Sequence, residues 1–202
     1  MADQLQWIDA ALQEAESNPS VRYIVLFGHQ PLFPCHGHVK DYGNVDVDNK
    51  TRAYTYRNGV MDPEKLGIVE VRNRLWRVIS RSTKVAAVLT AHEHLYHRTL
   101  ITNQTPVGVY PKDDVNGDGV LDTRSPDPEF VHPTWHLIVG SAGAPYSPCP
   151  KPPWPPDAYS LESGYALLTA DSDRVSLQFI SNTGQVLDEV PDLMAAKRGA
   201  AR

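Results

Sequence analysis

Two almost continuously apolar, β-branched runs constrain the fold of this chain more than any other feature. They cover residues 21–27 and 84–90, and each is preceded by a helical pattern and followed by a histidine. Runs of this length and composition are typical of strands that are buried on both faces. Helix followed by strand, twice within the first 90 residues, predicts an α/β layer.

The two helical patterns cover residues 4–16 and 62–80. Apolar side chains recur in the first at the i, i+3, i+4 spacing of an amphipathic helix. The second is expected to start at Asp62-Pro63-Glu64, which combines a cap, a proline in the first position and an acid in the first turn. Residues 28–61 lie between the first strand and this helix, show no sustained period and are expected to form a long functional loop.

Beyond residue 90 the pattern changes to short strands separated by turn residues. We expect strands at about 97–102, 106–110, 134–140, 164–171, 174–181 and 185–190. The whole is expected to be one domain over residues 1–190, followed by a flexible tail at 191–202. Within it, residues 103–131 are expected to form an insertion and the proline-rich residues 145–158 a rigid loop.

The net charge of −5, with no window rich in Lys or Arg, argues against a nucleic-acid or anionic-membrane surface. The apolar runs are far shorter than the ~20 residues of a membrane helix. The first residues lack the basic and then apolar pattern of a signal peptide. The chain has two cysteines, Cys35 and Cys149. They are either unrelated thiols or a disulfide pair, and a disulfide would argue for an oxidising compartment.

Histidines follow both predicted buried strands: His29 the first, His92 and His94 the second. In open α/β sheets, ligand sites gather just beyond the carboxyl ends of the strands. Three imidazoles there are a natural ligand set for Zn, Fe or Mn, although loop histidines with ordinary hydrogen bonds remain the alternative. A metalloprotease H-E-x-x-H motif does not fit, because Tyr96 stands where its second histidine belongs. A mononuclear three-histidine zinc site stays open.

Three segments of the chain carry a family resemblance: Gly28-His29-Gln30-Pro31, the run from Ala91 to Arg98 that contains H-E-H-L-Y-H-R, and the run from Gly140 to Pro145. Together they resemble the C-terminal half of calcineurin-like metallophosphoesterases, most closely the purple-acid-phosphatase-like branch. The resemblance implies the C-terminal part of a two-sheet β-sandwich flanked by helices. It also implies a dinuclear centre in which His29 and His92 bind one ion and His94 binds the other.

The resemblance further implies that the chain hydrolyses phosphoesters as part of a larger unit. The family's N-terminal motifs, D-x-H, G-D-x-x-D/Y and G-N-H-D/E, are lacking, and no histidine of the chain has an aspartate two residues before it. We therefore expect a half-domain that binds metal weakly and turns over little by itself. His36 and His38 lie at an offset similar to that of family histidines that contact phosphate or the leaving group, so they are candidate general acids, with solvated loop histidines as the alternative.

A second pattern resembles a calcium-binding loop. Oxygen-bearing residues occupy EF-hand positions 1, 3, 5 and 9, and a backbone carbonyl would come from position 7: Asp114, Asn116, Asp118, Asp122 and Val120. Ser125 stands at position 12 in place of the bidentate glutamate. Asp127 and Glu129 are the candidates to supply that missing ligand. An acidic hairpin tip is the other interpretation.

Two functions of different classes follow. The first is a hydrolase that supplies three metal-binding histidines to a phosphoester substrate site, with two transition-metal ions. The second is a non-catalytic, calcium-stabilised binding or structural module that retains the second half of the fold. The calcium-like loop and the two cysteines hint at a secreted or periplasmic parent protein.

Overall fold

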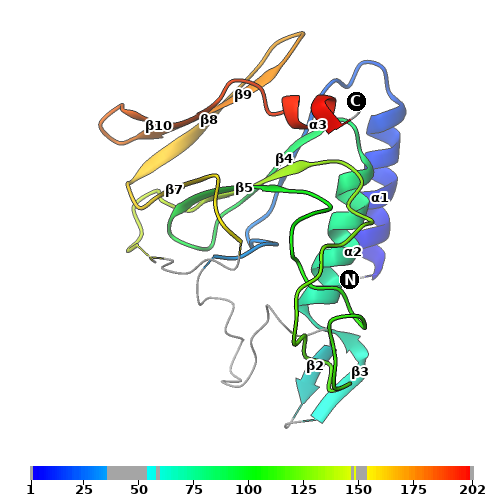
Figure 1. Ribbon diagram of the computed structural model, residues 1–202. Coiled ribbons are helices and arrows are strands. Elements are labelled where there is room, and N and C mark those ends of the chain that lie inside the picture. The colour runs from blue at the N-terminus through cyan, green and yellow to red at the C-terminus, as the bar shows by residue number, and fades with distance from the viewer. Residues whose placement is uncertain (1, 36–53, 58–59, 147, 149–153, 201–202) are drawn as a thin grey trace.

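The computed structural model describes residues 2–35, 54–57, 60–146, 148 and 154–200. The helices are α1 (Ala2–Ser17), α2 (Ile68–Arg81) and α3 (Ala195–Ala200). The strands are β1 (Ile24–Phe27), β2 (Tyr54–Arg57), β3 (Val60–Leu66), β4 (Val85–Thr90), β5 (Tyr96–Ile101), β6 (Thr134–Val139), β7 (Ala158–Ser160), β8 (Gly164–Ala170), β9 (Val175–Ser181) and β10 (Val186–Val190) (Figure 1). None of the described helices is long and apolar enough to span a membrane.

A five-stranded sheet in the order β1-β4-β6-β5-β7 forms the centre of the molecule. β1, β4 and β6 are parallel, while β5 and β7 run antiparallel to their neighbours. Helices α1 and α2 cover one face of this sheet, and the antiparallel sheet β10-β9-β8 faces the other (Figure 1). The expected α/β class, with two stacked sheets and flanking helices, is confirmed.

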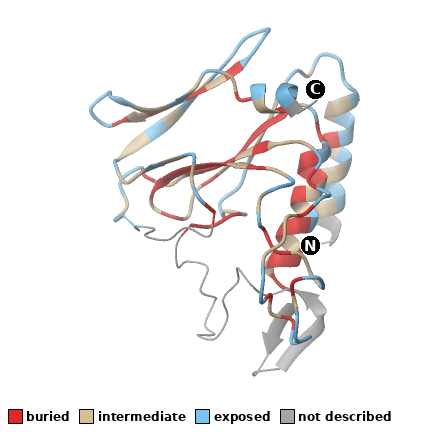
Figure 2. Cartoon of the chain, viewed as in Figure 1, coloured by how far each residue is buried: buried red, intermediate tan, exposed pale blue. Residues whose placement is uncertain are grey.

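The core between the helices and the central sheet is built from large side chains of both layers. Trp76 and Ile79 of α2 pack with Val85 and Val88 of β4, and Leu12 of α1 closes the cluster. The buried residues concentrate along β4, β5, β6 and the inner face of α2 (Figure 2). Burial of such side chains, at ~1.5–3 kcal/mol each, is what fixes the helices on the sheet.

A second cluster joins the two sheets. Leu177 and Phe179 of β9 face Leu137 of β6, and the ring of Tyr96 stacks on Phe179 with 4.0 Å between the centroids. The strict alternation of buried and half-buried residues along β9 is that of a strand with one face on the core. The sandwich predicted by the family resemblance therefore has a continuous apolar interior.

β1 is less buried than its sequence predicts. Among the described strands it lies at one edge of the central sheet, so its residues are half-buried and Phe27 is 76% exposed. β4 lies inside the sheet, and there the prediction of burial on both faces holds. Apolar composition alone does not distinguish an edge strand from a central one, because the difference depends on the neighbouring strand.

The predicted helix start at Asp62-Pro63-Glu64 is wrong. These residues lie in β3, which pairs with β2 in a hairpin, and α2 begins only at Ile68 after Gly67. The register passes from Thr55–Asp62 to Tyr54–Leu66, so Pro63 falls in an irregularity of the ladder. A bulge tolerates a residue without an N–H donor, and the hairpin therefore overrides the local helix signal.

Residues 106–110 form no strand, although the sequence predicts one. Gly108 has a positive φ of 85°, and the carbonyl groups of this segment accept hydrogen bonds from α2 side chains. Arg72 Nη2 donates to the Val107 carbonyl oxygen at 2.6 Å, and Asn73 Nδ2 donates to that of Gly108 at 2.7 Å. Two carbonyl groups that a strand would need are thus bonded to the helix.

The C-terminal segment, expected to be a flexible tail, contains α3 and packs on the core in its described part. Leu193 and Met194 are buried in the cluster between the sheets. The Lys197 ammonium, which is also buried, donates to the Ser82 carbonyl oxygen at 3.1 Å and to Thr134 Oγ1 at 2.8 Å. A short Ala- and Arg-rich sequence gives little sign of such docking, since the contacts come from residues far away in the chain.

Candidate metal centre

The carboxyl ends of β1, β4 and β6 meet at one edge of the central sheet because the three strands are parallel. His29 follows β1 by two residues and His92 follows β4 by two residues. Gly140 follows β6 directly. The turns that contain the histidines and the 140–145 loop therefore lie at the same edge of the sheet, as the order of the strands predicts.

His29 and His92 lie side by side at this edge. Nε2 of His29 is 3.1 Å from Nδ1 of His92, and the two rings are nearly perpendicular. The Ala91 N–H donates to the His29 carbonyl oxygen at 3.1 Å, which holds the two turns together. Neighbouring nitrogen ligands with Zn–N distances of ~2.0–2.1 Å lie about 3 Å apart. The spacing of this pair thus fits two ligands of one ion as well as it fits a hydrogen bond.

The backbone around His92 is irregular, as the H-x-H spacing requires. His92 has a φ of 60°, the one positive value among the non-glycine residues that the structure describes. The Glu93 N–H donates to the Ala91 carbonyl oxygen at 2.7 Å, and the Leu95 N–H donates to that of Glu93 at 2.9 Å. A left-handed histidine costs about 1–3 kcal/mol, and such residues cluster at functional sites.

His94 is oriented by the loop that follows β6. Its Nδ1 lies 2.8 Å from the Pro145 carbonyl oxygen. A carbonyl only accepts, so Nδ1 carries the proton and Nε2 the lone pair, the usual arrangement of a metal-binding histidine. Gly140 permits the close approach, because a Cβ there would lie 2.0 Å from the Glu93 carbonyl oxygen. The 140–145 motif therefore positions the second turn of the site.

The three predicted ligands are not assembled into one group. The structure brings His29 and His92 together and places His94 on Pro145. Within residues 2–35, 54–57, 60–146, 148 and 154–200, no three His, Cys, Asp or Glu side chains form a group that could hold a metal ion. Among the described residues, two of the three predicted ligands thus lie together, and the third contacts the loop after β6.

Two buried groups that sequence reasoning missed hold the loop after β1. Glu93 Oε2 accepts the Cys35 N–H at 2.7 Å, and Nε2 of His136 accepts the Leu32 N–H at 3.2 Å. Burial lowers the pKa of His136 to about 3, so the ring is neutral and can accept. Cys35 is buried and disulfide-bonded, with a partner outside the described residues. For Glu93, the sequence signal that could have indicated this role is its position inside the H-E-H motif.

The candidate general acids, His36 and His38, lie outside the described residues, as does Cys149. His97, which follows the H-E-H motif, lies in the core instead of at the site. Burial lowers the pKa of His97 to about 4.

The calcium-like loop is held together by its own carboxylates. Asp114 accepts the N–H groups of Gly117, Asp118 and Gly119 at 2.8–3.1 Å, and Asp122 accepts that of Val115 at 2.8 Å. Asn116 Oδ1 accepts the Asp118 N–H at 2.9 Å, and Asp118 Oδ1 accepts the N–H of Val120 at 2.8 Å.

Asp127 does not complete this loop. It is buried and pairs with Arg77 at 2.9 Å, and the exposed Glu129 lies 3.6 Å from the same guanidinium. The loop thus has no bidentate ligand from either candidate. Asp113, which the sequence pattern does not include, is the buried anchor: it accepts hydrogen bonds from Val109, Thr123 and Ser125.

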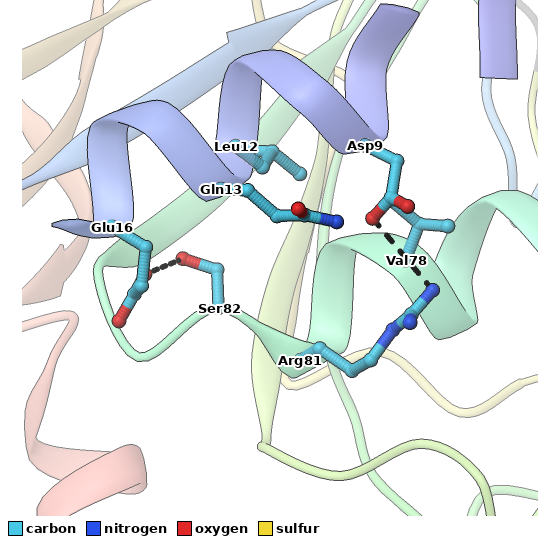
Figure 3. Close-up of a pocket in the computed structure, with 7 residues that line it drawn as sticks. All are labelled: Asp9, Leu12, Gln13, Glu16, Val78, Arg81 and Ser82. Atoms are coloured by element: carbon cyan, nitrogen blue, oxygen red, sulfur yellow. Dashed lines mark hydrogen bonds and ion pairs between the residues drawn. The ribbon is translucent and has the colours of Figure 1, made fainter. Parts of the chain in front are cut away.

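A small groove of about 100 Å³ between α1 and the end of α2 lies apart from the histidines (Figure 3). Asp9 and Arg81 form an ion pair across it at 3.8 Å, and Ser82 donates to Glu16 at 2.6 Å. Ser82 precedes β4 whereas His92 follows it, so groove and site lie at opposite ends of that strand. The groove is a packing feature of the two helices.

Comparison with known families supports the resemblance seen in the sequence. The fold is α/β with two stacked sheets, and residues 134–189 match the family model described as iron/zinc purple acid phosphatase-like protein C. This segment comprises β6 to β9 and most of β10. The chain thus resembles the C-terminal part of purple-acid-phosphatase-like metallophosphoesterases. The matched residues include the 140–145 loop but not His29, His92 or His94. No curated protein matches the chain.

Proposed function

We propose that this chain contributes to phosphoester hydrolysis at a dinuclear metal centre, with His29 and His92 binding one ion and His94 the other. The observation that carries the proposal is the 3.1 Å between Nε2 of His29 and Nδ1 of His92 at the carboxyl edge of parallel strands. The family match at residues 134–189 supports it independently, because that segment contains the loop that orients His94.

The residues of the chain have distinct tasks in this proposal. A bound metal pair would supply a water whose pKa is lowered toward ~7 and a clamp on the phosphoester oxygens. His29, His92 and His94 hold their nitrogens at the sheet edge, and the Pro145 carbonyl fixes the tautomer of His94. His36 or His38 would protonate the leaving oxygen.

In a complete homologue, His38→Ala should lower turnover and leave the metal content unchanged, and loss of metal would reassign His38 as a ligand.

We further propose that other ligands come from a segment that pairs with β1. Three imidazoles alone leave the charge of two cations largely uncompensated. Among the described residues, β1 is an apolar edge strand, and Phe27 on it and Trp7 on α1 are 76% and 68% exposed. Apolar edge strands without a protecting charge are normally covered in native proteins. Measurable phosphatase turnover by the purified 202-residue chain would contradict this part of the proposal.

Zinc calorimetry with single variants tests the metal site. His29→Ala and His92→Ala should each weaken the same binding step at least tenfold, because each removes one of two neighbouring ligands. His132→Ala is the matched control, since His132 precedes β6 and lies at the opposite edge of the sheet. Equal zinc heats for the wild type, His29→Ala and His92→Ala would remove the proposed function.

The second candidate, a calcium-stabilised module, rests on the loop at 114–122. The Asp114 carboxylate organises this loop by accepting three N–H groups, and this order favours a weak structural calcium site. Calorimetry should then show Ca²⁺ heat that Asp118→Ala reduces. Indistinguishable titrations of wild type and Asp118→Ala would eliminate this candidate.

A further inference from the structure

Glu93 lies between two of the histidines, and its side chain is completely buried. A carboxylate removed from water is costly unless hydrogen bonds compensate it. Its Oε2 accepts the backbone N–H of Cys35 at 2.7 Å, across 58 residues of sequence. Cys35 ends the described part of the loop that carries His29. The buried carboxylate thus connects the turn after β4 with the loop after β1.

Hydrogen bonds to other segments hold the loop from Gly28 to Cys35 at its start, its middle and its end. Its start is held by the Ala91 N–H on the His29 carbonyl oxygen, its middle by His136 on the Leu32 N–H, and its end by Glu93. The third is a hydrogen bond to a carboxylate, which is about twice as strong as a neutral one. Both ends of the loop are therefore attached to the turn that contains His92.

We propose that Glu93 is a positioning residue of the histidine site, which holds the His29 loop against the His92 turn through the Cys35 N–H. The proposal rests on the proposed metal function only for the identity of the ligand that His29 and His92 bind. The position of the pair itself is a property of the metal-free chain. Glu93 acts in this role through the backbone N–H of Cys35, which its Oε2 accepts at 2.7 Å.

The alternative is a purely electrostatic role, in which the carboxylate offsets the charge of bound metal. Two variants of Glu93 distinguish this role from positioning. Glu93→Gln keeps the length and an accepting oxygen but removes the charge. Glu93→Asp keeps the charge but withdraws it by one methylene from the Cys35 N–H. Positioning requires reach, whereas charge compensation requires charge, so the two variants separate these roles. Glu129→Gln is the matched control, because the Glu129 side chain is 67% exposed and lies 3.6 Å from Arg77.

The experiment measures zinc affinity by calorimetry and the His29–His92 ring contact by NMR on the metal-free 202-residue chain. Glu93→Asp should bind zinc about 10- to 100-fold more weakly, the usual effect of changing a group that orients a ligand, and should lose the nuclear Overhauser contact between the rings. Glu93→Gln should stay within about threefold of wild type and keep that contact.

Three results would overturn the proposal. They are wild-type behaviour of Glu93→Asp, an equal loss in Glu93→Gln, and rapid solvent exchange of the Cys35 amide in the wild type. The last measurement needs no variant, so the proposal stays testable if Glu93→Asp does not fold. A wild type that binds no zinc would refute the proposed function, while the ring contact would still decide the role of Glu93.

Discussion

A buried ion pair, Arg98–Asp188, links the two sheets beside their apolar cluster, and its removal gives the sharpest stability prediction. Asp188 of β10 accepts Arg98 Nε at 2.7 Å, Arg98 Nη2 at 2.9 Å and the Tyr96 hydroxyl at 2.6 Å. The side chains of Arg98 and Asp188 are only 9% and 12% exposed. Burial alone would raise the pKa of Asp188, but the hydrogen bonds from Arg98 and Tyr96 outweigh it and lower the pKa.

Asp188→Ala leaves the Arg98 charge buried without its partner, which costs about 3–5 kcal/mol. In a protein of this size, 1 kcal/mol lowers the melting temperature by ~2–4 °C, so the expected decrease is roughly 6–20 °C. The double variant Arg98→Met/Asp188→Leu removes both charges and leaves only the Tyr96 hydroxyl without its acceptor, at about 1–3 kcal/mol. The double variant should therefore be more stable than the single one.

Urea unfolding followed by circular dichroism measures both free energies under one set of conditions. Tyr165→Phe serves as a control, because this tyrosine lies on β8 and is 55% exposed. If Asp188→Ala loses less than about 1 kcal/mol, or if the double variant is as unstable as the single one, the buried-charge reasoning fails.

Three further outcomes are expected. Burial lowers the pKa of His97 to about 4 and that of His136 to about 3. Below pH 6.5 these two histidines therefore take up protons in the unfolded chain before they do so in the folded one. Urea titrations should show that the free energy of unfolding falls by about 2 kcal/mol per histidine between pH 7.5 and 5. His97→Gln should remove about half of that dependence, and an unchanged slope would contradict the assignment. Gly140→Ala should lower both the melting temperature and the zinc affinity, because the new Cβ would meet the Glu93 carbonyl oxygen; an unaffected variant would show that the turn is not tightly packed. Lys197→Ala should increase hydrogen exchange across α3, and unchanged exchange would mean that the two Lys197 hydrogen bonds do not hold the helix.

Except for β7, which the sequence did not predict, the strands of the sandwich could be predicted because their own residues determine the pattern. The continuous apolar run at 84–90 contains β4, and the alternation at 174–181 contains β9. Each strand is short, and its periodicity or burial is visible within a single window. The exposure of β1 at the sheet edge was not visible in the same way, because it depends on which strands flank it.

The hairpin of β2 and β3 could not be predicted from local signals. Asp62-Pro63-Glu64 has the composition of a helix start, and only the pairing with Tyr54–Arg57 makes this segment a strand. The docking of α3 was missed for a related reason. Lys197 finds its partners at Ser82 and Thr134, and no local pattern indicates contacts at such separations.

At the candidate site, the rule for carboxyl ends of strands predicted the neighbourhood of His29 and His92, which the structure shows. This rule could not predict the side chains that support the histidine site. Glu93 and His136 act on backbone N–H groups 58 and 104 residues away. Their importance follows from burial, which a motif does not encode.

Zinc titration followed by NMR of the imidazole nitrogens tests the central claim most directly. Nε2 of His29 and Nδ1 of His92 should shift together at the first equivalent of zinc, while the nitrogens of His132 stay unchanged. If the two rings respond separately, or not at all while other histidines do, the pair at the sheet edge is a hydrogen bond between loops and not part of a metal centre.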